Sequence, residues 1–184
     1  MASPLKPRLP EYSGKAKFND VSSKEWYADS IGYLSKYDII KGYADGTFKP
    51  DAPVTRAEFV SMTVRYYGLF NDVQKSGYTV KYTDVSSAYW AYADIAYAKH
   101  IGWLNGYADG TFRGDSNITR AEVVTVVNRA TGRTADKEYV KDNFTKLNRF
   151  TDVTDNSLWY FFDVNEAAND HKAVSSANSE VWVK

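Results

Sequence analysis

The chain repeats itself with an offset of 64 residues. The heptapeptide Gly-Tyr-Ala-Asp-Gly-Thr-Phe occupies residues 42–48 and returns at 106–112, and Thr-Arg-Ala-Glu occupies 55–58 and returns at 119–122. A third copy opens at 150–153 with Phe-Thr-Asp-Val but contains neither motif before residue 184. Tandem repeats bury their apolar faces against their neighbours and fold as an array. The sequence therefore predicts two complete units and one partial unit.

Apolar spacing predicts that the fold is mainly α. Tyr27, Ile31 and Leu34 follow one another at i, i+4 and i+7, which places them on one face of a helix over 26–34. The corresponding segment of the second unit repeats this pattern. A Thr-x-x-Glu capping box predicts that a second helix of each unit starts at Thr55 and at Thr119. Each complete unit is thus expected to be a helix, a loop and a helix.

The segments between and after these helices carry weaker signals. The two Asp-Gly pairs, at 45–46 and 109–110, are typical of a tight primed turn between two short extended pieces. We expect a charged connecting helix over 136–147, a first helix of the third unit over 157–169, and an extended segment at 181–183 that packs back on the body.

These patterns divide the chain into four segments. We expect residues 1–17 to be an extended, proline-containing linker, and 1–10 lack the pattern of a signal peptide. The repeats then occupy 18–78, 79–148 and, incompletely, 149–184.

Composition argues against several classes of function. The 23 basic and 23 acidic side chains cancel, which removes the bulk attraction expected of a protein that binds nucleic acid or an anionic membrane. Apolar runs are too short for membrane insertion. The chain has no cysteine, and its two histidines do not recur between the repeats. The sequence contains no Gly-x-Ser-x-Gly nucleophile elbow, no phosphate-binding glycine loop and no His-Glu-x-x-His motif. We therefore expect neither an enzyme nor a bound cofactor or metal.

Arg56 and Arg120 stand at helix starts, where a cation is mildly unfavourable against the helix dipole. Their recurrence suggests an anion held there by a guanidinium group together with free backbone amides. A salt bridge to a carboxylate of a neighbouring unit is the structural alternative.

Aromatic residues and Asp-Gly pairs are further candidates for the site. Tryptophan recurs near the start of each unit, where core packing is favoured over stacking on a sugar ring, whereas for the loop tyrosines both interpretations are equally open. Asp45 and Asp109 could ligate calcium, but one acidic residue per loop favours a structural turn. The candidate aromatic residues are Trp26, Trp90, Trp159, Tyr43 and Tyr107.

The succession Asp-Val, Trp, Gly-Tyr-x-Asp-Gly-Thr-Phe and Thr-Arg-Ala-Glu resembles the S-layer homology repeat, by which bacterial surface proteins hold the cell wall. The resemblance covers 18–67, 82–131 and the start of a third repeat. It implies three repeats in pseudo-threefold arrangement around a central helical bundle. Grooves between adjacent repeats would bind a secondary cell-wall polysaccharide, in better-known members through a pyruvylated amino sugar.

The resemblance also assigns roles to residues. Arg56 and Arg120 would meet anionic or hydroxyl oxygens of the sugar, and Gly46 and Gly110 would let the backbone approach the ring. Asp45, Asp109, Trp26 and Trp90 are further candidates on the same analogy, and the divergent third repeat leaves at most two similar grooves.

These expectations converge on a secreted, non-catalytic module that anchors a surface or S-layer protein to the bacterial cell wall. The first alternative is a module for protein interaction or self-assembly with other surface-layer copies. Wall hydrolysis is a third possibility.

Overall fold

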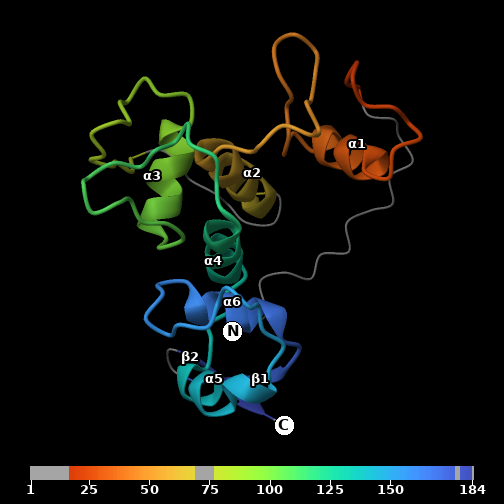
Figure 1. Cartoon of the computed structure of the whole chain (residues 1–184). Coiled ribbons are helices and arrows are strands. Elements are labelled where there is room, and N and C mark those ends of the chain that lie inside the picture. The colour runs from red at the N-terminus through yellow and green to blue at the C-terminus, as the bar shows by residue number, and fades with distance from the viewer. Residues whose placement is uncertain (1–16, 69–76, 177–178, 184) are drawn as a thin grey trace. The chain divides into compact units, whose positions relative to one another are not determined.

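The computed structural model describes residues 17–68, 77–176 and 179–183 of the chain. The linker expected over 1–17 lies almost wholly outside the described residues. The described part is mainly helical, as the spacing predicts (Figure 1). Its elements, in order, are α1 (Ala28–Lys36), α2 (Arg56–Gly68), α3 (Tyr92–His100), α4 (Arg120–Ala130), α5 (Lys137–Asn143), a 3-10 turn η1 (Phe144–Lys146), α6 (Phe161–Ala168), β1 (Lys172–Ser176) and β2 (Ser179–Val183).

The elements fall into two compact units, which are treated separately below. Among the described residues, the N-terminal unit comprises 17–101 and 105–118, and the C-terminal unit comprises 102–104 and 119–183. The N-terminal unit thus holds the first repeat and the first half of the second. The four-segment division and the pseudo-threefold arrangement stay predictions.

Capping boxes start the second helix of both complete repeats, as the sequence predicts. The Thr119 side chain accepts from the Glu122 amide, and Glu122 Oε2 accepts from the Thr119 amide at 2.9 Å. Thr55 and Glu58 make the same reciprocal pair, at 3.2 Å and 2.8 Å. Each box satisfies amides that the first helical turn leaves without a partner.

The heptapeptide loops are held by aspartates that precede them in each repeat. Asp20 accepts from the amides of Phe48 and Lys49 at 2.8 and 2.7 Å, and Asp84 accepts equivalently from Phe112 and Arg113. Hydrogen bonding from the Phe48 amide lowers the pKa of Asp20. The start of each repeat is therefore fastened to its own loop.

The turn inside each loop differs from the predicted primed turn. Gly46 has a φ of 80°, but Asp45 is not among the non-glycine residues with positive φ in the described chain. The Gly46 amide donates to the Tyr43 carbonyl at 3.0 Å, and the Tyr43 amide donates to the Thr47 carbonyl at 2.8 Å. This is a three-residue turn closed by a left-handed glycine. The expected extended pieces beside it are absent from the secondary structure of residues 41–50.

In the N-terminal unit, α2 packs beside α3, which belongs to the second repeat (Figure 1). A small apolar cluster of Ile31, Ile39 and Ile40 lies under the first loop and is flanked by Met62 and Tyr66 of α2. The α3 helix is buried from Asp94 to Ala98, whereas at the corresponding positions of α1 Ser30 is exposed and Leu34 half-buried. The packing partner α2 explains why α3 is the better covered helix.

The C-terminal unit packs α4 against α6 and closes with a β-hairpin. The hairpin pairs Lys172 with Val183 at one end and Ser176 with Ser179 at the other. Trp182 is buried with Val140, Val153 and Phe161, which confirms the extended C-terminal segment that the sequence predicts. The predicted connecting helix over 136–147 appears as α5 followed by η1, with the Asp136 side chain as N-cap.

A buried carboxylate holds this hairpin in place. Glu166 is fully buried and accepts from Trp182 Nε1 at 2.9 Å and from Arg133 Nε at 3.1 Å, while His171 Nε2 lies 3.1 Å from it. Burial raises the pKa of Glu166, and the interactions with His171 and Arg133 oppose that rise. Buried carboxylates normally need such partners.

Candidate functional site

Arg56 lies at the junction of the first and second repeats within the N-terminal unit. Its side chain is 7% exposed, and its Nε donates to the carbonyl of Phe112 at 3.0 Å. The guanidinium carbon also lies 4.9 Å from the ring centroids of both Tyr107 and Phe112. Arg56 thereby clamps the loop of the second repeat onto the start of α2.

Backbone groups reinforce the same junction. The amides of Arg56 and Ala57 donate to the carbonyls of Ser116 and Gly114, both at 2.9 Å, and the Ile118 amide donates to Val54. The backbone amides of Arg56 and Ala57, which the sequence predicts to be free for an anion, are therefore occupied by carbonyls of the second repeat. Arg120, which holds the same position in α4, is exposed.

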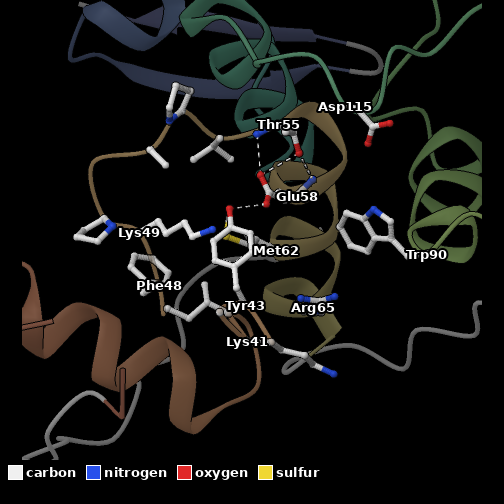
Figure 2. Close-up of a pocket in the computed structure, with 16 residues that line it drawn as sticks. Lys41, Tyr43, Phe48, Lys49, Thr55, Glu58, Met62, Arg65, Trp90 and Asp115 are labelled. Carbon is white, nitrogen blue, oxygen red and sulfur yellow. Dashed lines mark hydrogen bonds between the residues drawn. The ribbon is translucent and has the colours of Figure 1, made fainter. Parts of the chain in front are cut away.

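A pocket of about 540 Å³ lies next to this junction, wholly within the N-terminal unit (Figure 2). It is lined by the first loop, by one face of α2, and by two residues of the second repeat, Trp90 and Asp115. Its charged lining residues are Lys41, Lys49, Arg65, Glu58 and Asp115. Cations therefore outnumber carboxylates in the lining.

One wall of the pocket is set by the capping-box glutamate. Tyr43 Oη donates to Glu58 Oε1 at 3.1 Å, while Glu58 Oε2 accepts from Thr55 (Figure 2). Burial, followed by the hydrogen bond to Glu58, raises the pKa of Tyr43. Lys49 Nζ lies 4.3 Å from the centre of the Tyr43 ring. One glutamate therefore both caps α2 and fixes an aromatic side chain in the pocket.

The opposite wall carries an exposed aromatic face. Trp90 is 56% exposed, and Figure 2 shows it on the same side of α2 as Asp115, away from Tyr43 and Lys49. Asp115 Oδ1 accepts from Tyr89 Oη at 2.6 Å. The pocket thus combines an open aromatic ring, fixed carboxylates and nearby cations.

The expectation of core packing is wrong for all three repeated tryptophans. Trp26 is 88% exposed and Trp159 62% exposed, and Trp90 opens into the pocket. Of the loop tyrosines, Tyr43 lines the pocket and Tyr107 stacks against Arg56.

Asp45 and Asp109 shape the turns. Asp45 Oδ1 accepts from the amide and the hydroxyl of Thr47, and Asp109 Oδ1 does the same with Thr111. These hydrogen bonds lower the pKa of both carboxyl groups, and for Asp109 the adjacent Arg113 adds to the effect. In the described part of the chain, acidic and histidine side chains form no cluster of three that could hold a metal ion.

Several residues of the site escaped the sequence analysis. At the offset of 64, Lys41, Lys49 and Tyr89 meet a different residue type. Arg65 and Asp115 do recur, as Arg129 and Asp51, but they lie outside the two repeated motifs. Asp20 and Asp84 did carry a signal, because an aspartate recurs at the same place in each repeat. Recurrence marked the scaffold of the loops better than it marked the pocket.

No helix among the described residues is long and apolar enough to cross a membrane.

Comparison with known proteins adds an independent line of evidence. The sequence profile of the S-layer homology domain matches residues 17–60 and 81–124.

Three relatives illustrate the similarity. The chain is 33% identical over 174 residues to a cellulosome-anchoring protein of Acetivibrio thermocellus. The matched stretch covers 91% of this chain and 36% of that protein. It is 32% identical over 174 residues to cell surface glycoprotein 1 of the same organism, covering 91% of this chain and 7% of the relative. An amylopullulanase of Thermoanaerobacterium thermosulfurigenes is 34% identical over 119 residues, which are 63% of this chain and 6% of the enzyme.

The chain thus spans a minor part of each of these relatives, although nearly all of it is matched in the first two. The two profile matches coincide with the two complete repeats, and each includes its loop and its arginine. The chain therefore belongs to the S-layer homology family, with two domains of that type followed by a divergent third repeat.

Proposed function

We propose that this chain is a non-catalytic module that anchors a surface protein to the bacterial cell wall, and that the pocket beside Trp90 binds an acidic sugar of a wall polysaccharide. Membership of the S-layer homology family supports the anchoring role. The amylopullulanase relative is an enzyme by name, but this chain matches only 6% of it. Its similarity is therefore compatible with an anchoring segment attached to a separate catalytic part.

The pocket is the observation that carries the sugar assignment. Sugar rings stack their C–H faces on aromatic rings, and the Trp90 residue is more than half exposed. Lys41, Lys49 and Arg65 in the lining favour an acidic substituent on that sugar. Because the net charge of the whole chain is zero, attraction to an anion has to come from such a local group of cations.

The two repeated arginines take different roles in this proposal. Arg56 acts by fixing the second repeat, so that Trp90 and Asp115 face the first loop across the pocket. Arg120, which is exposed, stays available for direct contact with glycan. A second weak contact on the same polysaccharide would lengthen residence on the wall through effective concentration.

The test is sedimentation with purified cell walls, before and after mild acid removes the wall-linked polysaccharide but spares peptidoglycan. The expected result is binding to intact walls that is lost with the polysaccharide. The matched variants are Trp90→Ala, which removes the aromatic face in the pocket, and Trp159→Ala, which removes an exposed tryptophan of the third repeat. Unchanged binding after acid treatment, or equal binding by Trp90→Ala and the unmodified chain, contradicts the proposal.

Self-assembly is the second candidate, and the exposed Trp26 favours it. This side chain is 88% exposed, although its counterpart Trp90 meets the preceding repeat at the pocket. An oligomer that forms without glycan, and that Trp26→Ala abolishes, would support assembly. Light scattering of the two proteins over a range of concentrations distinguishes these outcomes.

A further inference from the structure

The second repeat contains a tyrosine–aspartate pair at the edge of the pocket. Tyr89 Oη donates to Asp115 Oδ1 at 2.6 Å, a length typical of a strong hydrogen bond to a carboxylate. The Tyr89 side chain also lies directly against the backbone at Gly114, two residues after the second heptapeptide. A Cβ atom added to this glycine would lie 2.7 Å from Tyr89 Oη. Burial, followed by the hydrogen bond to Asp115, raises the pKa of Tyr89, so the phenol stays a donor at neutral pH.

This pair does not recur elsewhere in the chain. At the offset of 64, Glu25 stands in place of Tyr89 and Pro50 in place of Gly114, although Asp51 keeps the aspartate. In the third repeat, Leu158 precedes the tryptophan. The first repeat folds without this hydrogen-bonded pair, so the pair is not part of the scaffold that the two repeats share. We therefore look for its purpose in the immediate surroundings of Tyr89 and Asp115.

The location of the pair gives that purpose. Asp115 and the next-door neighbour of Tyr89, Trp90, both line the pocket. An ionised carboxylate is an acceptor only, with lone pairs left on both oxygens after it has accepted one hydrogen bond. An aromatic face beside a fixed acceptor suits a sugar ring that presents C–H groups to the face and a hydroxyl or amide donor at its edge.

The two repeats contribute different charges to the pocket. Asp115 is the charged residue that the second repeat supplies to the lining, and its carboxylate disfavours an acidic substituent beside it, whereas Lys49 of the first repeat, which Figure 2 shows on the other side of α2 beside Tyr43, favours one. We propose that Asp115 is a specificity residue that accepts a hydroxyl or amide hydrogen from the uncharged edge of the bound sugar, and that Tyr89 is the positioning residue that orients it. This inference rests on the proposed function and assigns the orientation of the sugar within that site.

The test uses the full chain and purified walls that carry their polysaccharide. Asp115→Asn keeps the shape of the side chain but makes half of it a donor, and it is expected to weaken binding roughly five- to tenfold, the equivalent of one lost hydrogen bond. Asp51→Asn, the same change at the equivalent exposed position of the first repeat, is expected to leave the dissociation constant unchanged.

Tyr89→Phe separates positioning from a merely structural role. It is expected to weaken binding about threefold, by releasing Asp115 without removing it. In the Asp115→Asn background the same change is expected to have no further effect on binding, because there is no longer a carboxylate to orient. A purely structural tyrosine would weaken binding equally in both backgrounds, and that result overturns the positioning role.

The remaining outcomes separate this inference from the proposed function. Binding by the unmodified chain together with equal binding by Asp115→Asn overturns the specificity role and leaves the anchoring function standing. Failure of the unmodified chain to bind intact walls overturns both. Unfolding midpoints in urea, measured for every variant, show whether a loss of binding reflects a loss of fold.

Discussion

At the scale of single residues, identical side chains at equivalent positions of the two repeats have different environments. Arg56 is buried and donates to the carbonyl of Phe112, whereas Arg120 is exposed. The difference arises because the second repeat supplies a loop that covers Arg56, while the third repeat lacks the heptapeptide that forms such a loop. Substitution should therefore affect the two arginines unequally.

Arg56→Ala is expected to lower the free energy of unfolding by about 1.5–3 kcal/mol, the usual effect of losing a hydrogen bond from a charged group. Urea denaturation followed by circular dichroism measures it. Arg120→Ala is the matched control and should stay within about 0.5 kcal/mol, as exposed substitutions do. Arg56→Lys should not restore the loss, because lysine lacks the planar group that stacks on Tyr107 and Phe112. Equal effects of the two alanine variants would contradict the clamp.

Gly42 is required by a close approach as well as by its backbone angle. Its φ is 66°, and a Cβ atom there would overlap the Phe18 ring and lie 2.7 Å from the Thr47 carbonyl oxygen. Gly102 has a similar φ of 81°, but no atom lies within 4 Å of a Cβ added there. A substitution at Gly102 therefore measures the effect of the backbone angle without the steric clash. Gly42→Ala is expected to destabilise the chain by about 1–3 kcal/mol more than Gly102→Ala. Equal unfolding midpoints for the two variants would show that the ring and carbonyl move aside freely.

At the scale of elements, the heptapeptide loops depend on ionised aspartates. The pKa values of Asp20, Asp45 and Asp109 are all lowered in the folded chain, by hydrogen bonds from their own loop. A lowered folded-state pKa means that the contribution to stability is present above the unfolded value of about 3.9 and is lost as the pH falls below it. The loops should therefore weaken in acid before the helices do.

Asp109→Asn tests this dependence. Asparagine keeps an oxygen that accepts from Thr111 but no longer titrates, so the variant should lose less stability than the unmodified chain between pH 5 and pH 3. The measurement is the shift of the urea midpoint across that range. A midpoint that falls equally in both proteins would mean that Asp109 titrates normally in the fold.

Local sequence signals predicted the elements well and their surroundings poorly. The capping boxes fixed the starts of α2 and α4 because the interacting residues are three positions apart. The exposure of Trp26, Trp90 and Trp159 was not predictable, because it depends on which neighbouring segment covers each ring. The same holds for Asp115, whose place in the pocket depends on how the second loop docks on α2. Family resemblance supplied the function class, and only the fold showed that Arg56 is buried.

At the scale of the whole molecule, the pocket and the C-terminal hairpin belong to different compact units. Every residue that lines the pocket lies within the N-terminal unit. The hairpin is held instead by Glu166, Arg133 and Trp182 of the C-terminal unit. The stability of the C-terminal unit and the proposed sugar binding should therefore respond separately to changes in these two places.

Trp182→Phe keeps most of the buried ring but removes the indole donor of Glu166. Because a buried carboxylate then loses a partner, the C-terminal unit should be destabilised by about 1–3 kcal/mol. Sedimentation with cell walls at neutral pH, where the variant is still folded, should match that of the unmodified chain. Trp159→Phe, at an exposed tryptophan, is the control and should change stability by no more than about 0.5 kcal/mol. Loss of wall binding by Trp182→Phe at unchanged stability would mean that the hairpin itself contributes to the glycan site.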